Sequence, residues 1–181
     1  MQQSVTIKEL YDWARGYDAA GLNKIYLHWT ATDYDLSDAY HICIDKDGVV
    51  YIMNPLDSTL AATWRRNTGS IAVAIACAYD AVAYSRTSVD LGSAPPTKQQ
   101  IESMAQVVCA LSNALDIDMT VDNVMTHAEV ADIDNYGIDG PDPDLRWDLL
   151  LLPDYDDELR PGGEVIRGKA IWYHYNHDNL F

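Results

Sequence analysis

The chain has 181 residues, of which 48% are hydrophobic, and its 28 acidic and 12 basic side chains give a formal net charge of −16. This length fits one domain with a substantial core, and the ordinary apolar content argues against a disordered chain. The acidic excess argues against nucleic acids and anionic membranes as partners, because both require lysine and arginine to neutralise phosphates.

Two features of the sequence bear on the cellular compartment. Met1–Ser4 lead into a polar segment instead of the apolar core of a signal peptide. The longest apolar run, from Ile71 to Tyr79, is shorter than the roughly 18–20 residues that a membrane span needs. We therefore expect a protein that is cytoplasmic when synthesised and that has no membrane segment.

The three cysteines are odd in number and far apart in the sequence, at Cys43, Cys77 and Cys109. This spacing favours buried, reduced thiols. A role for Cys43 as a metal ligand or nucleophile is the alternative.

The first predicted helix follows Thr6, since Thr6 and Glu9 form a capping box and apolar residues then recur at helical spacing up to Gly16. Residues 24–30 alternate instead, which predicts a strand with Leu27 on one face and His28 on the other. From spacing alone, His28 is either a core histidine with satisfied hydrogen bonds or a ligand.

The middle of the chain reads as a hairpin, a buried strand and a long helix. Residues 40–45 and 49–53 flank an Asp-Gly turn, and Tyr40 is expected to share a face with Ile42 and Ile44. Residues 70–78 are small and apolar, as in a strand buried on both faces. Residues 80–94 are expected to form a loop, in which no chemistry is recognisable. A second capping box, Thr97 to Gln100, then opens a helix with an apolar stripe.

The segment from Val124 to Leu149 carries the strongest signal for chemistry. The apolar residues Val124 and Met125 predict a short strand with His127 at its end, and a polar loop containing several aspartates follows. Catalytic zinc sites combine three such nitrogen and oxygen ligands with one open position. After this loop, residues 149–152 are expected to continue a short helix from Asp148. The aromatic end of the chain is expected to pack on the core, with a glycan groove as the alternative.

Several segments, in this order along the chain, resemble the zinc-dependent N-acetylmuramoyl-L-alanine amidases, the family that includes phage lysozyme-amidases and peptidoglycan recognition proteins. The matching segments are 24–32, 39–48, 67–71, 96–100, 126–127, 142–143 and 147–148. The resemblance implies an α/β fold in which helices flank a central mixed β-sheet. It also implies one catalytic domain over residues 1–181, with residues 153–181 as an extension packed on it.

The resemblance further implies a zinc ion held by His28, His127 and Asp142. The family places its third ligand before a proline and six residues before the aspartate of an aromatic-Asp pair, which leads from Asp148 back to Asp142. Asp144 is the alternative ligand. Asp148 is then expected to orient the helix start or to support the ligands.

The sequence also departs from the family pattern. Many relatives carry a lysine two positions before the third ligand, where this chain has Gly140, and some carry a glutamate on the strand that here spans residues 70–78. The general base therefore has no candidate. Tyr40 is the matched catalytic group, as an oxyanion donor or an orienter of water.

We therefore expect a zinc-dependent hydrolase that cleaves the amide bond between N-acetylmuramic acid and L-alanine in peptidoglycan. The expected biological role is that of a monomeric phage or prophage endolysin, made in the cytoplasm and acting on the cell wall after release by a partner holin. A cytosolic amidase that recycles muropeptides, and a peptidoglycan-binding protein without catalysis, are the alternatives.

Overall fold

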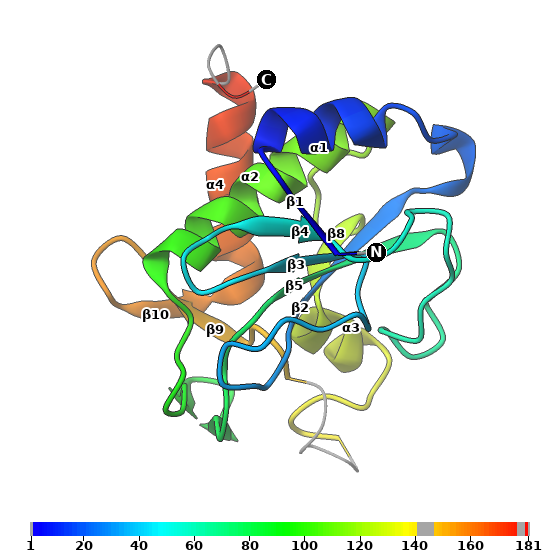
Figure 1. The fold of residues 1–181 in the computed structure, drawn as a ribbon. Coiled ribbons are helices and arrows are strands. Elements are labelled where there is room, and N and C mark those ends of the chain that lie inside the picture. Colours follow the sequence, from blue (N-terminus) through cyan, green and yellow to red (C-terminus); the bar gives the residue numbers. More distant parts are fainter. Residues whose placement is uncertain (1, 141–146, 177–179, 181) are drawn as a thin grey trace.

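The centre of the computed structural model, which describes residues 2–140, 147–176 and 180, is a six-stranded sheet (Figure 1). The strands β3, β5, β2 and β8 are adjacent in this order and run parallel to one another. In contrast, β4 runs antiparallel to both of its neighbours, β1 and β3. In order across the sheet the strands are β1 (Gln3–Val5), β4 (Val50–Ile52), β3 (Ile42–Ile44), β5 (Ser70–Ile75), β2 (Lys24–Trp29) and β8 (Val124–Thr126). This mixed sheet, flanked by helices, confirms the predicted fold class.

Helices cover both faces of the sheet (Figure 1). One face carries α1 (Ile7–Ala14), α2 (Lys98–Leu115) and α4 (Gly162–Tyr175), and the other carries α3 (His127–Ile133). A short 3-10 turn, η1 (Ala19–Gly21), precedes β2. The predicted capping boxes at the starts of α1 and α2 are both present, so these helices begin where their first backbone N–H groups find side-chain acceptors.

The alternation of residues along the strands separates an apolar face from the face that bears His28. Leu27 of β2 packs in the main core beneath α1, α2 and α4, together with Val73 of β5 and Ile42 of β3. On the opposite face the register places His28 beside Ala74, and Ala74 beside Cys43. The predicted orientation of His28, away from the face of Leu27, is therefore confirmed.

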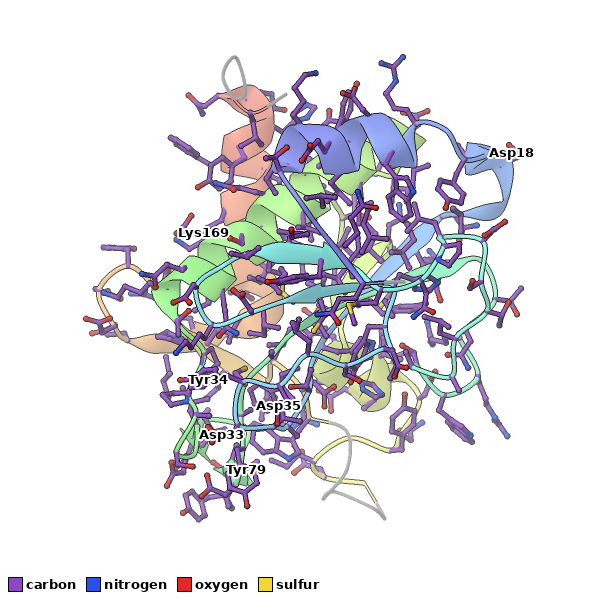
Figure 2. The ribbon with its side chains drawn as sticks, viewed as in Figure 1. Asp18, Asp33, Tyr34, Asp35, Tyr79 and Lys169 are labelled. Carbon is purple, nitrogen blue, oxygen red and sulfur yellow. The ribbon has the colours of Figure 1, made fainter. Side chains whose placement is uncertain are left out.

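The segments that follow the parallel strands β2 and β5 emerge at the same edge of the sheet. Thr32, after β2, forms a parallel bridge with Ala78, after β5. Figure 2 shows Asp33 and Asp35 near Tyr79 at this end of the molecule. The carboxyl end of β2 therefore lies next to a group of loops, where functional residues of sheets are commonly placed.

Two small antiparallel ribbons differ from the sequence-based predictions. In the region that was predicted to lack recognisable chemistry, β6 (Val82–Ser85) pairs with β7 (Ser88–Asp90). The helix expected over residues 149–152 is wrong, because β9 (Leu151–Pro153) pairs with β10 (Leu159–Pro161). Leu149 has a φ of 59°, a left-handed conformation that a right-handed helix cannot include.

The carboxyl-terminal part of the chain packs on α2 through α4. Lys169 and Tyr173 both reach Glu102 of α2, at 2.6 and 2.9 Å. The neighbouring Trp172 and Tyr175 are 59% and 79% exposed, so only part of this aromatic segment packs on the core as predicted. None of the helices within the described ranges has the length and apolar character needed to cross a membrane.

Candidate metal site

His28 lies near the carboxyl end of β2 and is 1% exposed. Its Nδ1 is 3.1 Å from Oδ2 of Asp148, and its Nε2 is 3.1 Å from Oγ1 of Thr63. The ring centroid is 4.8 Å from that of His127. His28 therefore lies in a buried polar cluster, and the structure brings it together with the second predicted ligand.

His127 is placed by the junction between β8 and α3. Thr126 is the N-cap of α3: its Oγ1 accepts from the backbone N–H of Glu129, and its own N–H donates to Oε2 of Glu129. His127 is therefore the first residue of a helix. The prediction that a loop follows His127 directly is wrong, because the Thr-x-x-Glu sequence at residues 126–129 is a third capping box.

Asp148 joins the two histidines from a turn between two buried apolar residues. Trp147 packs edge-on against Trp29, with ring centroids 4.8 Å apart, and Leu149 is fully buried. The backbone carbonyl of Asp148 accepts from the N–H of Ala128. The predicted place of Asp148 at a helix start is wrong, since the chain turns here. The alternative, that Asp148 supports the ligands, agrees with its hydrogen bonds to both histidines.

The separations of Asp148 from the two histidines fit a tetrahedral cation. Two ligand atoms bound to zinc at about 2.0–2.1 Å lie about 3.3 Å apart when the angle at the metal is tetrahedral. Oδ2 of Asp148 is 3.1 Å from Nδ1 of His28 and 3.2 Å from Nδ1 of His127. One ligand atom from each of the three residues lies within 4.8 Å of the others. Two imidazoles and one carboxylate also form a donor set that zinc prefers.

The surroundings of His28 and Asp148 favour the forms of these two groups that bind metals. Burial lowers the pKa of His28, which favours the neutral imidazole, although the hydrogen bond to Asp148 acts in the opposite direction. Burial raises the pKa of Asp148, but hydrogen bonds from His127 and His28 outweigh this effect and hold the pKa well below its usual range. A neutral imidazole and an ionised carboxylate need no further proton loss before they bind a cation.

Tyr40, the predicted catalytic residue, lies beside this cluster. Its ring centroid is 5.2 Å from that of His28, and its hydroxyl donates to the carbonyl of Trp29 at 3.2 Å. The expected face shared with Ile42 and Ile44 is wrong, because Tyr40 precedes β3 and packs with Cys43 on the opposite face. Burial, with a further contribution from Asp148, raises the pKa of Tyr40, so the phenol keeps the proton that a hydrogen-bond donor needs.

The other aspartates between Val124 and Leu149 divide into two groups. Asp132 and Asp139 pair with Arg86, and Asp134 pairs with Arg66, so these three carboxylates neutralise arginines. The predicted ligand Asp142 and the alternative ligand Asp144 lie outside the described residues. The assignment of Asp142 therefore stays a prediction.

Relatives carry a lysine and a glutamate at two positions, Gly140 and β5, where this structure has no room for a side chain and no acidic group, respectively. A Cβ at Gly140 would lie 2.9 Å from the carbonyl oxygen of Gly137 and from Cα of Tyr136, so the backbone there would have to move to admit a side chain. On β5, Ala72 and Ala74 face the side of His28 and are buried. Neither position supplies a general base.

The three cysteines are free and buried. Burial raises the pKa of Cys43, Cys77 and Cys109, which keeps the thiols protonated. The predicted buried, reduced state is therefore confirmed, and the metal cluster formed within the described residues contains no cysteine.

Sequence reasoning missed Thr63 and the pair formed by Glu129 and Arg167, both of which hold the histidines. The capping-box pattern at residues 126–129 was a signal for Glu129. No local pattern in the sequence distinguishes Thr63 from other polar residues in loops.

Comparisons with known proteins were made for the whole chain. A family model described as N-acetylmuramoyl-L-alanine amidase matches residues 15–142. Among solved structures, the chain is similar to the endolysin N-acetylmuramoyl-L-alanine amidase LysCS from Clostridium intestinale URNW. The identity is 20% and the TM-score is 0.44, over 60% of this chain and 70% of the other. No curated protein matches the chain. The family match ends before Asp148 and α4.

Proposed function

Because the chain belongs to the N-acetylmuramoyl-L-alanine amidase family, we propose that its amidase reaction is zinc-dependent and that it cleaves the bond between N-acetylmuramic acid and L-alanine. The cluster of His28, His127 and Asp148 is the observation that carries the zinc proposal. Oδ2 of Asp148 lies as far from each imidazole nitrogen as in a tetrahedral site, and the donor set is one that zinc prefers.

The chemistry divides between the ion and the residues of the chain. Bound zinc would polarise the carbonyl and lower the pKa of a water molecule to about 7. His28 and His127 would hold the ion through nitrogen, and an aspartate would hold it through oxygen. The phenol of Tyr40 is protonated and close to His28. It would turn from the carbonyl of Trp29 to donate its hydrogen bond to the oxygen that becomes negative as the amide is attacked.

Two measurements test the proposal. Elemental analysis of the purified chain should find about one zinc per molecule, since three protein ligands form one catalytic site. Mass spectrometry of digested peptidoglycan should find free stem peptides and intact glycan strands. Zinc without any released peptide would favour the peptidoglycan-binding alternative, and release of peptides by a zinc-free protein would contradict the zinc dependence.

The third ligand is tested by four variants, with Asp122→Asn as a control because Asp122 is exposed and lies outside the cluster. His28→Ala and His127→Ala should both empty the site. Asp142→Asn and Asp148→Asn separate the two aspartates. If only Asp148→Asn loses zinc, Asp148 is the third ligand. If only Asp142→Asn loses zinc, Asp142 is the third ligand and Asp148 supports the two histidines.

We also propose that the enzyme is an endolysin that reaches the wall from the cytoplasm after release. A protein with a net charge of −16 gains no electrostatic attraction to the anionic polymers of a cell wall. Added from outside, it should therefore lyse cells only when their wall is exposed. Efficient killing of intact Gram-positive cells at low concentration would contradict this.

A further inference from the structure

Thr63 contacts the ring nitrogen of His28 that faces away from Asp148. It lies in the segment between β4 and β5 and is 1% exposed. Its Oγ1 is 3.1 Å from Nε2 of His28, while Nδ1 on the other side of the ring is 3.1 Å from Asp148. The imidazole is therefore held at both nitrogens, by a carboxylate at one and by a hydroxyl at the other.

The Thr63 hydroxyl is itself held in place by a tight turn. The backbone N–H of Thr63 donates to Oδ1 of Asn67 at 2.8 Å, and the Thr63 carbonyl accepts from the N–H of Arg66 at 3.0 Å. The guanidinium of Arg66 forms two 2.8 Å bonds with Asp134, at the end of α3. The turn that carries Thr63 is therefore tied to the helix that begins with His127.

A hydroxyl suits this position because it both donates and accepts hydrogen bonds. An ionised carboxylate only accepts, so without metal Nδ1 of His28 carries the proton and donates it to Asp148. Nε2 then accepts from the Thr63 hydroxyl. If Nδ1 held a cation, the proton of the neutral ring would be on Nε2, and the same hydroxyl would accept from it after rotating about its C–O bond.

We propose that Thr63 is a positioning residue for His28, holding the ring by a hydrogen bond that persists when the ring changes tautomer to bind the metal. The inference rests on the proposed zinc function. His127 differs, because its Nε2 is buried and has no hydrogen-bond partner within the described residues. Among the described residues the two histidines are thus supported unequally, since only His28 has a hydrogen-bond partner at Nε2.

The test compares Thr63→Val, which keeps the shape and removes the hydroxyl, with Thr63→Ser, which keeps the hydroxyl. Thr59→Val is the matched control, since Thr59 is an exposed threonine of the same segment. Zinc and cobalt affinities are measured by competition with a chelator, and the visible spectrum of the cobalt form reports on ligand geometry. Melting of the metal-free proteins shows whether each variant folds.

Loss of a residue that orients a metal-binding histidine typically costs 10–100-fold in metal affinity. We expect a loss of about that size and an altered cobalt spectrum for Thr63→Val, with both restored in Thr63→Ser and unchanged in Thr59→Val. A folded Thr63→Val chain with the parental affinity and spectrum would overturn the inference and leave the zinc proposal standing. A parent chain that binds neither ion would overturn both.

A measurement on the parent chain covers the case in which Thr63→Val does not fold. Nitrogen-15 NMR of the imidazole distinguishes the two tautomers. We expect the His28 proton on Nδ1 in the metal-free protein and on Nε2 after zinc is added. An Nε2 that carries no proton in the zinc-loaded protein would overturn the inference, since Thr63 would then have no proton to accept.

Discussion

Arg167 of α4 and Glu129 of α3 form a two-point ion pair, with N–O distances of 2.8 and 2.7 Å. Arg167 also donates to the carbonyl of Val124 in β8. At Gly163, on the first turn of α4, a Cβ would overlap the Glu129 carboxylate, so the two helices meet closely. Because Glu129 also caps the helix that begins with His127, α4 contributes to holding the candidate metal site although it lies beyond the family match.

Arg167→Met should destabilise the protein through this connection. The change keeps much of the length of the side chain but removes the charge, and Glu129 is only 26% exposed. Breaking a buried pair by removing one partner typically costs about 3 kcal/mol or more. We expect a loss near the lower end of this range in the free energy of unfolding, measured by urea denaturation.

Arg160→Met is the matched control for that experiment. The side chain of Arg160 pairs with three acidic residues and is 33% exposed, against 11% for Arg167. We therefore expect a smaller loss for Arg160→Met, because ion pairs nearer to solvent contribute about 0–1 kcal/mol. An Arg167→Met chain no less stable than Arg160→Met would show that α4 does not hold the start of α3.

Asp148→Asn should lower the stability of the metal-free protein. Oδ2 of Asp148 accepts from Nδ1 of both imidazoles, and an amide oxygen can accept the same two bonds but carries no negative charge. Because a hydrogen bond to a charged group contributes about 1.5–3 kcal/mol and one between neutral groups about 0.5–1.5 kcal/mol, we expect a loss of about 1–3 kcal/mol. Urea denaturation in the presence of a chelator measures the effect, and Asp122→Asn should stay within about 0.5 kcal/mol of the parent chain. Equal stability of both variants would contradict the role given to Asp148.

His41 should make stability depend on pH. Nδ1 of His41 accepts from the N–H of Ala72, and Nε2 is 2.9 Å from the carbonyl of Ser58, to which it donates. Burial lowers the pKa of His41 in the folded protein, whereas the pKa in the unfolded chain is about 6.5. Its contribution to stability is therefore present above pH 6.5 and is lost as the pH falls below it, by at most about 1.4 kcal/mol per pH unit.

His41→Gln isolates that contribution, because an amide can make both hydrogen bonds without taking up a proton. The free energy of unfolding of the metal-free proteins is compared at pH 7 and pH 5. The parent chain should lose more stability than the variant over this range, and effects of other groups cancel in the difference. Equal losses would show that His41 takes up no extra proton on unfolding.

Local patterns in the sequence were sufficient to predict most of the fold, whereas the meeting of His28 and His127 was predicted from the family resemblance. Alternation along β2 decides which face His28 occupies, because successive side chains of a strand point to opposite faces. The capping boxes before α1 and α2 mark where these helices begin. These features depend on residues close together in the chain, which is why local patterns reveal them.

The position of Asp148 depends on contacts that no local pattern contains. It meets His28 across 120 positions of sequence, and the turn that directs it depends on the left-handed Leu149 and on the packing of Trp147 against Trp29. Read locally, Trp-Asp-Leu-Leu resembles a helix start. The contact between Thr63 and His28 also arises only when the loop before β5 folds onto the sheet.

Tyr40→Phe should reduce turnover and leave the fold intact. The phenol lies beside His28 and keeps its proton, because burial raises its pKa. It donates to the carbonyl of Trp29, so the substitution costs about 1 kcal/mol of stability, whereas loss of an oxyanion donor typically costs about 10²–10³ in kcat. We expect at least a tenfold fall in amidase activity, with melting temperature and zinc content near those of the parent chain.

Tyr51→Phe is the control for this prediction, since Tyr51 packs against the same cluster of Cys43 and Met53, and its hydroxyl contacts Asp45. Release of stem peptides from purified peptidoglycan is the readout for both variants. Activity should fall only in Tyr40→Phe, because only Tyr40 has its ring next to His28. If Tyr40→Phe is fully active, the phenol serves packing alone, and the developing negative charge must be stabilised by another group, such as the metal.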